Sequence, residues 1–397
     1  MKTNKVIFGF SKKEVIQISF LFILLFFAYS YLTFLAKGDM SDHACFAREA
    51  LEGKMNYFGN FILYILINFF SFCLSIFSSL LSLPTISKIS LSFLLAAATT
   101  YKFCWTYKNI PQYSGEWKRF LIALSMIFIV AIPIPTIFVT GCWYIGNFTP
   151  NVWHNSTTIF LFPFAIVLFA MSIKQLENFS NRRNLWLLLL VFLNIFVKPS
   201  YFFVWVCVYS LFLLIKYGLS SKFFKGLIPV IVGIVFLFIQ YIWIYYFFPP
   251  TNDEASIIIK PFQSYIFYTP LYILPWALIS SLLFPILYFV LNFKRLYKNS
   301  TFLFVFASFF VALIIFILLG ETGPREKDLN FYWQIVPTAW LCFYISLVDY
   351  LKNKRQLKQN DSLKIKINNY LPAVVFAIHI ITGVAYLGMY ILTKNYV

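Results

Sequence analysis

Residues 15–36 read VIQISFLFILLFFAYSYLTFLA, and about 20 predominantly apolar residues can cross the ~30 Å hydrocarbon core of a bilayer as one α-helix. Residues 227–248 form a second run of this kind. Lipid offers the peptide groups no hydrogen-bond partners, so a chain with many such runs crosses as helices, because open sheets leave their edges unpaired. The sequence therefore predicts an all-α, polytopic membrane helix bundle.

The composition extends this prediction to the whole chain. Of its 397 residues, 61% are hydrophobic and 12% are charged, whereas roughly 25% of the residues in a soluble protein carry a charge. We expect one integral membrane domain over residues 1–397, with about eleven transmembrane helices. The expected spans are residues 14–36, 87–107, 120–140, 158–173, 185–197, 200–217, 226–248, 271–292, 301–319, 333–350 and 371–393.

The basic residues orient these spans. Cytoplasmic loops are enriched in Lys and Arg, and an inside N-terminus puts most of the 32 basic residues there if the apolar stretch 58–82 lies laterally or re-enters the membrane. Twelve spans with the N-terminus outside fit the charges almost as well, but four lysines within the first 13 residues favour the first arrangement. The net charge of +18 then reflects membrane orientation, and no nucleic-acid partner is expected.

In this arrangement the cytoplasmic side holds little beyond short basic connectors, so chemistry is expected in the outer loops and in the space beneath them. Residues 37–86 form the first and longest extracytoplasmic loop, with membrane-parallel helices. Two further outer loops follow at residues 141–157 and 320–332.

The first outer loop holds the candidate catalytic residues. Residues 38–54 read GDMSDHACFAREALEGK, in which Ser41 can cap a short helix. Asp39 and Asp42 would lie at the start of this helix, where the dipole favours an ionised carboxylate that can accept a proton from a hydroxyl group. Each carboxylate could instead serve only as a cap of a surface helix. The candidate catalytic residues are Asp39, Asp42 and His43.

The second outer loop reads GCWYIGNFTPNVWHNST over residues 141–157. It combines aromatic faces with amide groups, which suits a sugar ring that stacks through its C–H face and forms hydrogen bonds through its hydroxyls. An aromatic belt at the membrane interface would give a similar composition. The candidate substrate-binding residues are Asn151, Trp153, His154 and Asn155.

Lys198 and Pro199 interrupt an otherwise apolar sequence, and an ionisable residue in such a place indicates a functional site. A lysine there can hold a lipid phosphate as a point charge, or it can extend to the headgroups at a tight turn. The third outer loop is the most charged outer stretch, and its arginine can bind a phosphate through paired donors; a solvated, salt-bridged turn is the alternative. Its candidate residues are Glu321, Arg325 and Asn330.

No metal or cofactor is expected. The three histidines, His43, His154 and His379, are too scattered for a metal-ligand spacing, and the six cysteines form no metal-binding pattern. Cys45 and Cys142 would both lie outside the membrane, where a disulfide is possible.

This layout is similar to the GT-C superfamily of membrane glycosyltransferases, which includes protein mannosyltransferases and the lipid A aminoarabinose transferase. The resemblance is carried by the acidic segment from Asp39 to His43 in a long outer loop, by the lateral stretch 58–82, and by the Lys198–Pro199 break between two spans. It runs from the N-terminus to about residue 220 and is looser beyond.

The resemblance implies an enzyme that moves a sugar from a polyprenyl phosphate to a glycan, lipid or glycolipid acceptor on the extracytoplasmic face. Asp39 or Asp42 would deprotonate the acceptor hydroxyl, while Lys198 and Arg325 would neutralise the departing phosphate. The second loop would orient the sugar. A chain rich in Phe, Lys and Asn is typical of AT-rich bacterial genomes, so we expect the cytoplasmic membrane of a bacterium.

Two other functions remain open. A flippase or transporter for lipid-linked glycans would need polar residues near the bilayer midplane and repeated halves, whereas the predicted spans hold few charges and no obvious repeat. An O-antigen-type polysaccharide polymerase would use two sugar-bearing lipids and outer loops of the same kind, so the sequence barely separates it from a transferase.

Overall fold

The computed structural model describes residues 9–54, 59–77, 80–112, 115–243, 256–323, 326–354 and 363–396. Nearly all of its regular structure is helical. The helices are α1 (Lys12–Leu35), α2 (Asp39–Leu51), α3 (Phe61–Phe77), α4 (Leu83–Asn109), α5 (Glu116–Phe128), α6 (Thr136–Thr140), α7 (Ser156–Glu177), α8 (Asn181–Val197), α9 (Ser200–Tyr217), α10 (Ser221–Ile242), α11 (Gln263–Ile266), α12 (Leu274–Ser281), α13 (Leu283–Leu291), α14 (Phe293–Leu296), α15 (Ser300–Leu318), α16 (Ile335–Lys354) and α17 (Leu363–Thr393). Two 3₁₀ helices, η3 (Leu271–Ile273) and η5 (Asn330–Tyr332), and two short antiparallel strands, β1 (Ile257–Ile259) and β2 (Leu319–Glu321), complete it.

The prediction of a multi-span helical membrane protein is confirmed. Among the described residues, eight helices are long and apolar enough to cross a bilayer, and a ninth crossing would come from two helical segments that meet at 66°, Leu271–Ser281 and Leu283–Leu291. Helices α5 and α8, where two further spans were predicted, have only 13 and 17 residues. The chain is therefore an all-α, multi-pass integral membrane protein.

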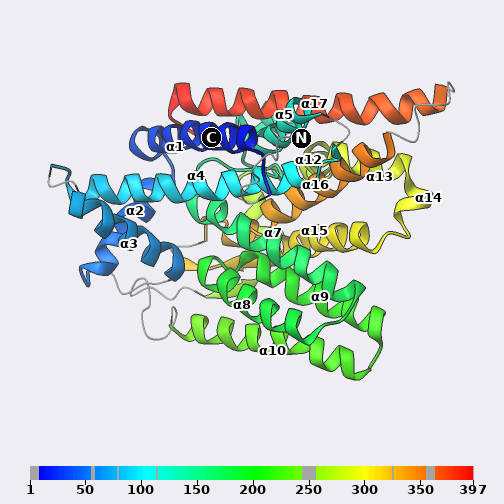
Figure 1. The fold of residues 1–397 in the computed structure, drawn as a ribbon, viewed down its shortest axis with the longest axis horizontal. Helices are drawn as coiled ribbons and strands as arrows, with labels where there is room; N and C mark the ends of the chain where they lie inside the picture. Colours follow the sequence, from blue (N-terminus) through cyan, green and yellow to red (C-terminus); the bar gives the residue numbers. More distant parts are fainter. Residues whose placement is uncertain are drawn as a thin grey trace, which may run out of the picture.

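The long helices pack side by side around α7. Helix α7 packs against α4 and α8, α1 packs on α4, α10 packs on α8, and α15 lies between α9 and α16. Figure 1 shows α1 and α17 along one edge of the molecule and α10 along the opposite edge. Helices α2 and α3 lie together at one end of the bundle, and α14 lies at the other end. The segment that contains α2 and α3 thus forms one end of the molecule.

The short helix predicted near residues 41–52 is confirmed, but the predicted cap at Ser41 is wrong. The cap of α2 is Gly38, three residues earlier, with a φ of 151° that residues with a side chain rarely adopt. A Cβ atom at Gly38 would lie 3.0 Å from the Tyr390 hydroxyl and 3.2 Å from the Cβ atom of His154. This glycine lets the first turn of α2 approach residues far away in the sequence.

The region predicted as a span at residues 120–140 is not one continuous helix. Helix α5 ends at Phe128, and an extended segment with Pro133 and Pro135 separates it from α6. Proline lacks the backbone N–H that a helix needs, so these two residues break the helix. The buried His379 of α17 compensates: its Nδ1 donates to the Val130 carbonyl at 2.7 Å.

Helix α17 packs against this region at a glycine, which gives a test of the fold. A Cβ atom at Gly383 would lie 1.5 Å from the carbonyl oxygen of Phe128, whereas a Cβ atom at Gly388 would meet nothing within 4 Å. Gly383→Ala is expected to destabilise the protein by about 1–3 kcal/mol, because the backbone of α17 or of Phe128 must shift to make room for the new methyl group. Gly388→Ala should leave stability unchanged or raise it by up to about 1 kcal/mol. Thermal unfolding in detergent, followed by circular dichroism, measures both, and equal melting temperatures would contradict the packing.

Candidate active site

The carboxylate of Asp39 lies at the amino end of α7. It accepts hydrogen bonds from Asn155 Nδ2 at 2.6 Å, from the Ser156 backbone N–H at 2.9 Å and from the Ser156 hydroxyl at 3.3 Å. Helix α7 has 22 residues, and its dipole places partial positive charge at this end. The first residue of α2 is thereby attached to the start of a central helix.

Lys198 completes this arrangement from the turn between α8 and α9. Its ammonium donates to Asn155 Oδ1 at 3.0 Å and to the hydroxyls of Thr157 and Thr158 at 2.8 and 2.9 Å. These contacts orient the Asn155 amide, since Oδ1 faces the ammonium while Nδ2 faces the Asp39 carboxylate. The ammonium also lies 4.6 Å from the ring centre of Trp333, a favourable cation–π distance.

The electrostatics of this pair depend on burial. Removal from water raises the pKa of Asp39 to about 6, although the hydrogen bonds of Ser156 and the charge of Lys198 favour the ionised form. Burial lowers the pKa of Lys198 to about 7, and the charge of Asp39 opposes this. The Asp39 side chain keeps 29% of its surface exposed, so the protein does not enclose it completely.

The two neighbouring histidines are neutral at physiological pH. Burial, together with the charge of Lys198, lowers the pKa values of His43 and His154 to about 3. The distance of 3.7 Å from His43 Nε2 to Asp39 Oδ2 is therefore not an ion pair. The other nitrogen of His43, Nδ1, shares a hydrogen bond of 2.8 Å with the Tyr64 hydroxyl, which fixes the ring.

Aromatic rings surround His154. The ring of Tyr396 stacks on it with centroids 4.1 Å apart, Tyr144 meets it edge-on at 4.7 Å, and Trp333 lies at 6.0 Å. Tyr390 donates to the Lys37 carbonyl at 2.7 Å, so α17 also contacts the segment that leads into α2. The site thus gathers residues from five regions of the chain: the start of α2, the loop before α7, the turn after α8, the residues around Trp333 and the C-terminal end.

Of the sequence-predicted residues, the structure brings Asp39, His43, His154, Asn155 and Lys198 together. Asp42 lies on the exposed side of α2. Glu321 is buried and accepts a hydrogen bond of 2.6 Å from Asn330, so these two residues pair with each other. Arg325 lies outside the described residues.

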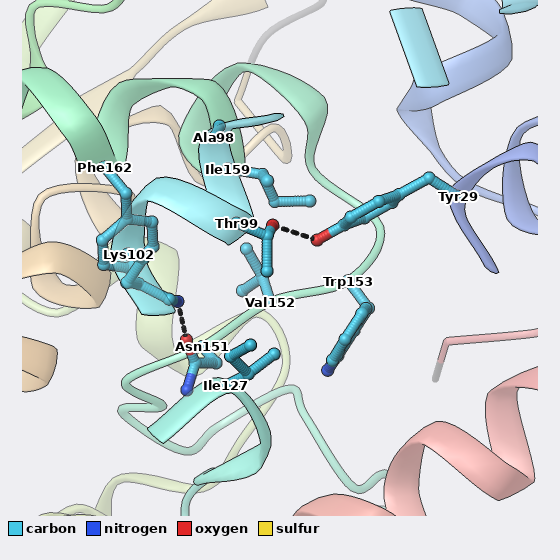
Figure 2. Close-up of a pocket in the computed structure, with 10 residues that line it drawn as sticks. All are labelled: Tyr29, Ala98, Thr99, Lys102, Ile127, Asn151, Val152, Trp153, Ile159 and Phe162. Atoms are coloured by element: carbon cyan, nitrogen blue, oxygen red, sulfur yellow. Dashed lines mark hydrogen bonds between the residues drawn. The ribbon is translucent and has the colours of Figure 1, made fainter. Parts of the chain in front are cut away.

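Asn151 and Trp153 point into a different region, shown in Figure 2. The Asn151 side chain accepts from the ammonium of Lys102 and donates to the backbone carbonyls of Met126 and Ile129. The Trp153 ring packs against Tyr29, with centroids 5.6 Å apart. Both line a cavity of about 10 Å³, room for roughly one water molecule.

Sequence reasoning missed several residues of the site. Ser156, Thr157 and Thr158 follow Asn155 directly, and such a polar run before a long apolar helix is an N-cap signal that places them around a helix start. Asn155 indeed accepts a hydrogen bond from the Thr158 N–H as the cap of α7. Tyr396 carried no comparable signal, because it reaches the site only through the packing of α17.

No metal site is evident in the part of the chain that the structure describes, where no three His, Cys, Asp or Glu side chains form a potential ligand group. The disulfide considered between Cys45 and Cys142 is not formed, and both residues are free thiols. Comparison with protein-family models and with curated proteins found no match to this chain.

Asn155 is the residue on which this arrangement can be tested. Asn155→Leu removes one hydrogen bond from Asp39 and one from Lys198, and leaves each of these two partly buried charges with one partner fewer. We expect a loss of about 2–4 kcal/mol in the free energy of unfolding. Asn181→Leu, at an exposed position at the start of α8, should change stability by less than about 0.5 kcal/mol. Unfolding in mixed detergent micelles measures the difference, and equal losses would refute the network.

Proposed function

We propose that the chain is a GT-C-type glycosyltransferase that moves a sugar from a polyprenyl-phosphate donor to a glycan or lipid acceptor on the extracytoplasmic face of a bacterial cytoplasmic membrane. The observation that carries the proposal is the partly exposed Asp39 carboxylate, whose pKa is raised to about 6 and which shares Asn155 with the Lys198 ammonium. A base with a pKa near the working pH transfers protons efficiently.

In the proposed reaction Asp39 takes the proton of the acceptor hydroxyl. The acceptor oxygen forms a bond to the anomeric carbon from the side opposite the phosphate, and the bond between that carbon and the phosphate oxygen breaks. The polyprenyl phosphate leaves with the electron pair. No metal is needed for this balance, since the proton goes to the carboxylate and the leaving group is already a stable anion.

Lys198 would contribute its charge rather than a free N–H group, because its three protons already have acceptors in Asn155, Thr157 and Thr158. A positive charge held rigidly in a water-poor site stabilises developing negative charge more strongly than one in bulk water. The indole of Trp333, which is partly exposed, would offer a surface for the sugar, and the buried His154 would support the aromatic rings around it.

The proposed topology has eleven crossings with the N-terminus inside, of which the short helices α5 and α8 each make one. Helix α3 would lie laterally at the outer surface. Its exposed face carries large apolar side chains at helical spacing, as expected of a helix in contact with lipid. These residues are Phe61, Ile65, Phe69, Phe72 and Ile76.

Donor turnover tests the base. Purified protein in lipid nanodiscs would be incubated with a panel of radiolabelled polyprenyl-phosphate monosaccharides and a crude glycolipid acceptor fraction. Asp39→Asn is expected to lower donor consumption by about 10²- to 10⁴-fold, whereas Asp42→Asn, at an exposed position, should retain it.

Two results would count against this assignment. Equal activity of wild type and Asp39→Asn would remove Asp39 as the base. Failure of the wild type to consume any monosaccharide donor would remove the transferase and leave the polymerase or flippase.

The pH profile of kcat/KM tests the charge state. Loss of a proton from Asp39 creates the base, so the rate is expected to rise with pH through about 6. Lys198 loses its charge as the pH rises past about 7, so the rate should fall again. Because the two groups interact, the apparent pKa values of this bell belong to the pair. A rate that stays constant from pH 5 to pH 8 would contradict the assignment.

A further inference from the structure

A second pocket lies next to the candidate active site and contains a buried threonine hydroxyl that has no hydrogen-bond partner among the described residues. It is bounded by residues 144–148, by residues 264–269 and by η5, and its volume is about 20 Å³. The Thr269 side chain lines it and is 1% exposed. Among the described residues, no group forms a hydrogen bond with the Thr269 hydroxyl.

The backbone at Gly146 lies very close to the Thr269 hydroxyl. Gly146 has a φ of 87°, and a Cβ atom there would lie 2.2 Å from Thr269 Oγ1. A glycine is therefore required for the wall of the pocket to reach the hydroxyl. A buried polar group without a partner costs free energy, so a hydroxyl kept at this position indicates a partner that comes from outside the protein.

The chemistry of the lining is neutral. Aromatic rings from Tyr144, Phe148 and Tyr332 combine with hydroxyls from Ser264 and Thr269, and none of the lining residues that the structure describes is charged. Such a set excludes phosphate as a favoured occupant and suits the hydroxyl groups and C–H faces of a sugar. The small volume admits one substituent of a sugar ring but not the ring itself.

Tyr144 connects this pocket to the candidate active site. Its ring contacts that of His154, at 4.7 Å, and that of Tyr332, at 5.7 Å, and it forms part of the pocket wall. It also stacks with the ring of Trp333, with centroids 6.5 Å apart, so a sugar lying over Trp333 would have the pocket within reach of one of its substituents.

We propose that the pocket lined by Thr269 receives a neutral, hydroxyl-bearing substituent of the glycan substrate, with the Thr269 hydroxyl as its direct hydrogen-bond partner. This inference rests on the proposed function and adds a determinant of sugar specificity to it. A site that hydrogen-bonds a sugar hydroxyl discriminates strongly against sugars that lack it, because the buried partner is then left unsatisfied.

Binding of simple sugars tests the pocket without turnover. The probes are the methyl glycosides of glucose, galactose, mannose and N-acetylglucosamine, observed by saturation-transfer NMR on the full chain in lipid nanodiscs free of glycoside detergents. At least one probe is expected to bind the wild type, and Thr269→Val should weaken that binding by about fivefold. Thr338→Val is the matched control, because that buried hydroxyl already donates within α16.

Thermal unfolding of Thr269→Val adds a second readout. Valine has almost the same shape as threonine and removes the unpartnered hydroxyl, so the ligand-free variant is expected to melt at or above the wild-type temperature. A variant that melts lower while its sugar binding is unchanged would show that the hydroxyl serves only a trapped water, and would overturn the proposal.

Other outcomes separate the pocket from the enzyme. Donor turnover with sugar binding that Thr269→Val does not affect would overturn the pocket and leave the glycosyltransferase standing. Sugar binding that depends on Thr269, in a protein that consumes no donor, would support the pocket and overturn the transferase. Absence of binding by all four glycosides to the wild type would overturn the pocket.

Discussion

The attachment of Asp39 to the amino end of α7 is the interaction on which the candidate site depends. It joins residue 39 to residues 155 and 156, and Lys198 joins the same cap to the turn between α8 and α9. A charge buried without a partner costs several kcal/mol. Removal of either Asp39 or Lys198 would therefore leave the charge of the other residue uncompensated. Polar contacts thereby set the relative placement of α2, α7 and α9.

The loop before α7 can be buried because its polar groups are satisfied by side chains from distant helices. The Phe148 N–H donates to the Ser281 hydroxyl at 2.9 Å, and Tyr332 both accepts from the Thr149 N–H and donates to the Asn147 carbonyl. In a membrane protein, irregular backbone is tolerated away from water only when it is enclosed by other protein groups. A loop held in this way presents His154 and Asn155 as rigidly as a helix would.

How far the sequence could anticipate this site differs from residue to residue. Hydropathy located most of the long helices, and the sidedness of the loops grouped Asp39, His154 and Lys198, which do meet. The sequence also contains a signal for the interruption after Phe128, since Pro133 and Pro135 cannot continue a helix. It contains no signal for the direction of the Trp153 side chain, because an irregular loop has no period from which side-chain orientation follows. Tyr396 reaches His154 across more than 200 residues of chain, a contact that only helix packing determines.

Asp39 serves two roles that compete in the proposed reaction. As an anchor it accepts three hydrogen bonds from Asn155 and Ser156, and these hold the charge of the carboxylate in place. As a base it must take up a proton, which weakens the same hydrogen bonds because a carboxylic acid is a poorer acceptor. Burial lessens the conflict, since it makes the ionised form less favourable and brings the two protonation states closer in free energy. His43 and His154 are neutral, so Lys198 is the cation that balances this charge among the residues that contact the cap of α7. Catalysis at Asp39 and the attachment of α2 to α7 therefore rest on the same ammonium group.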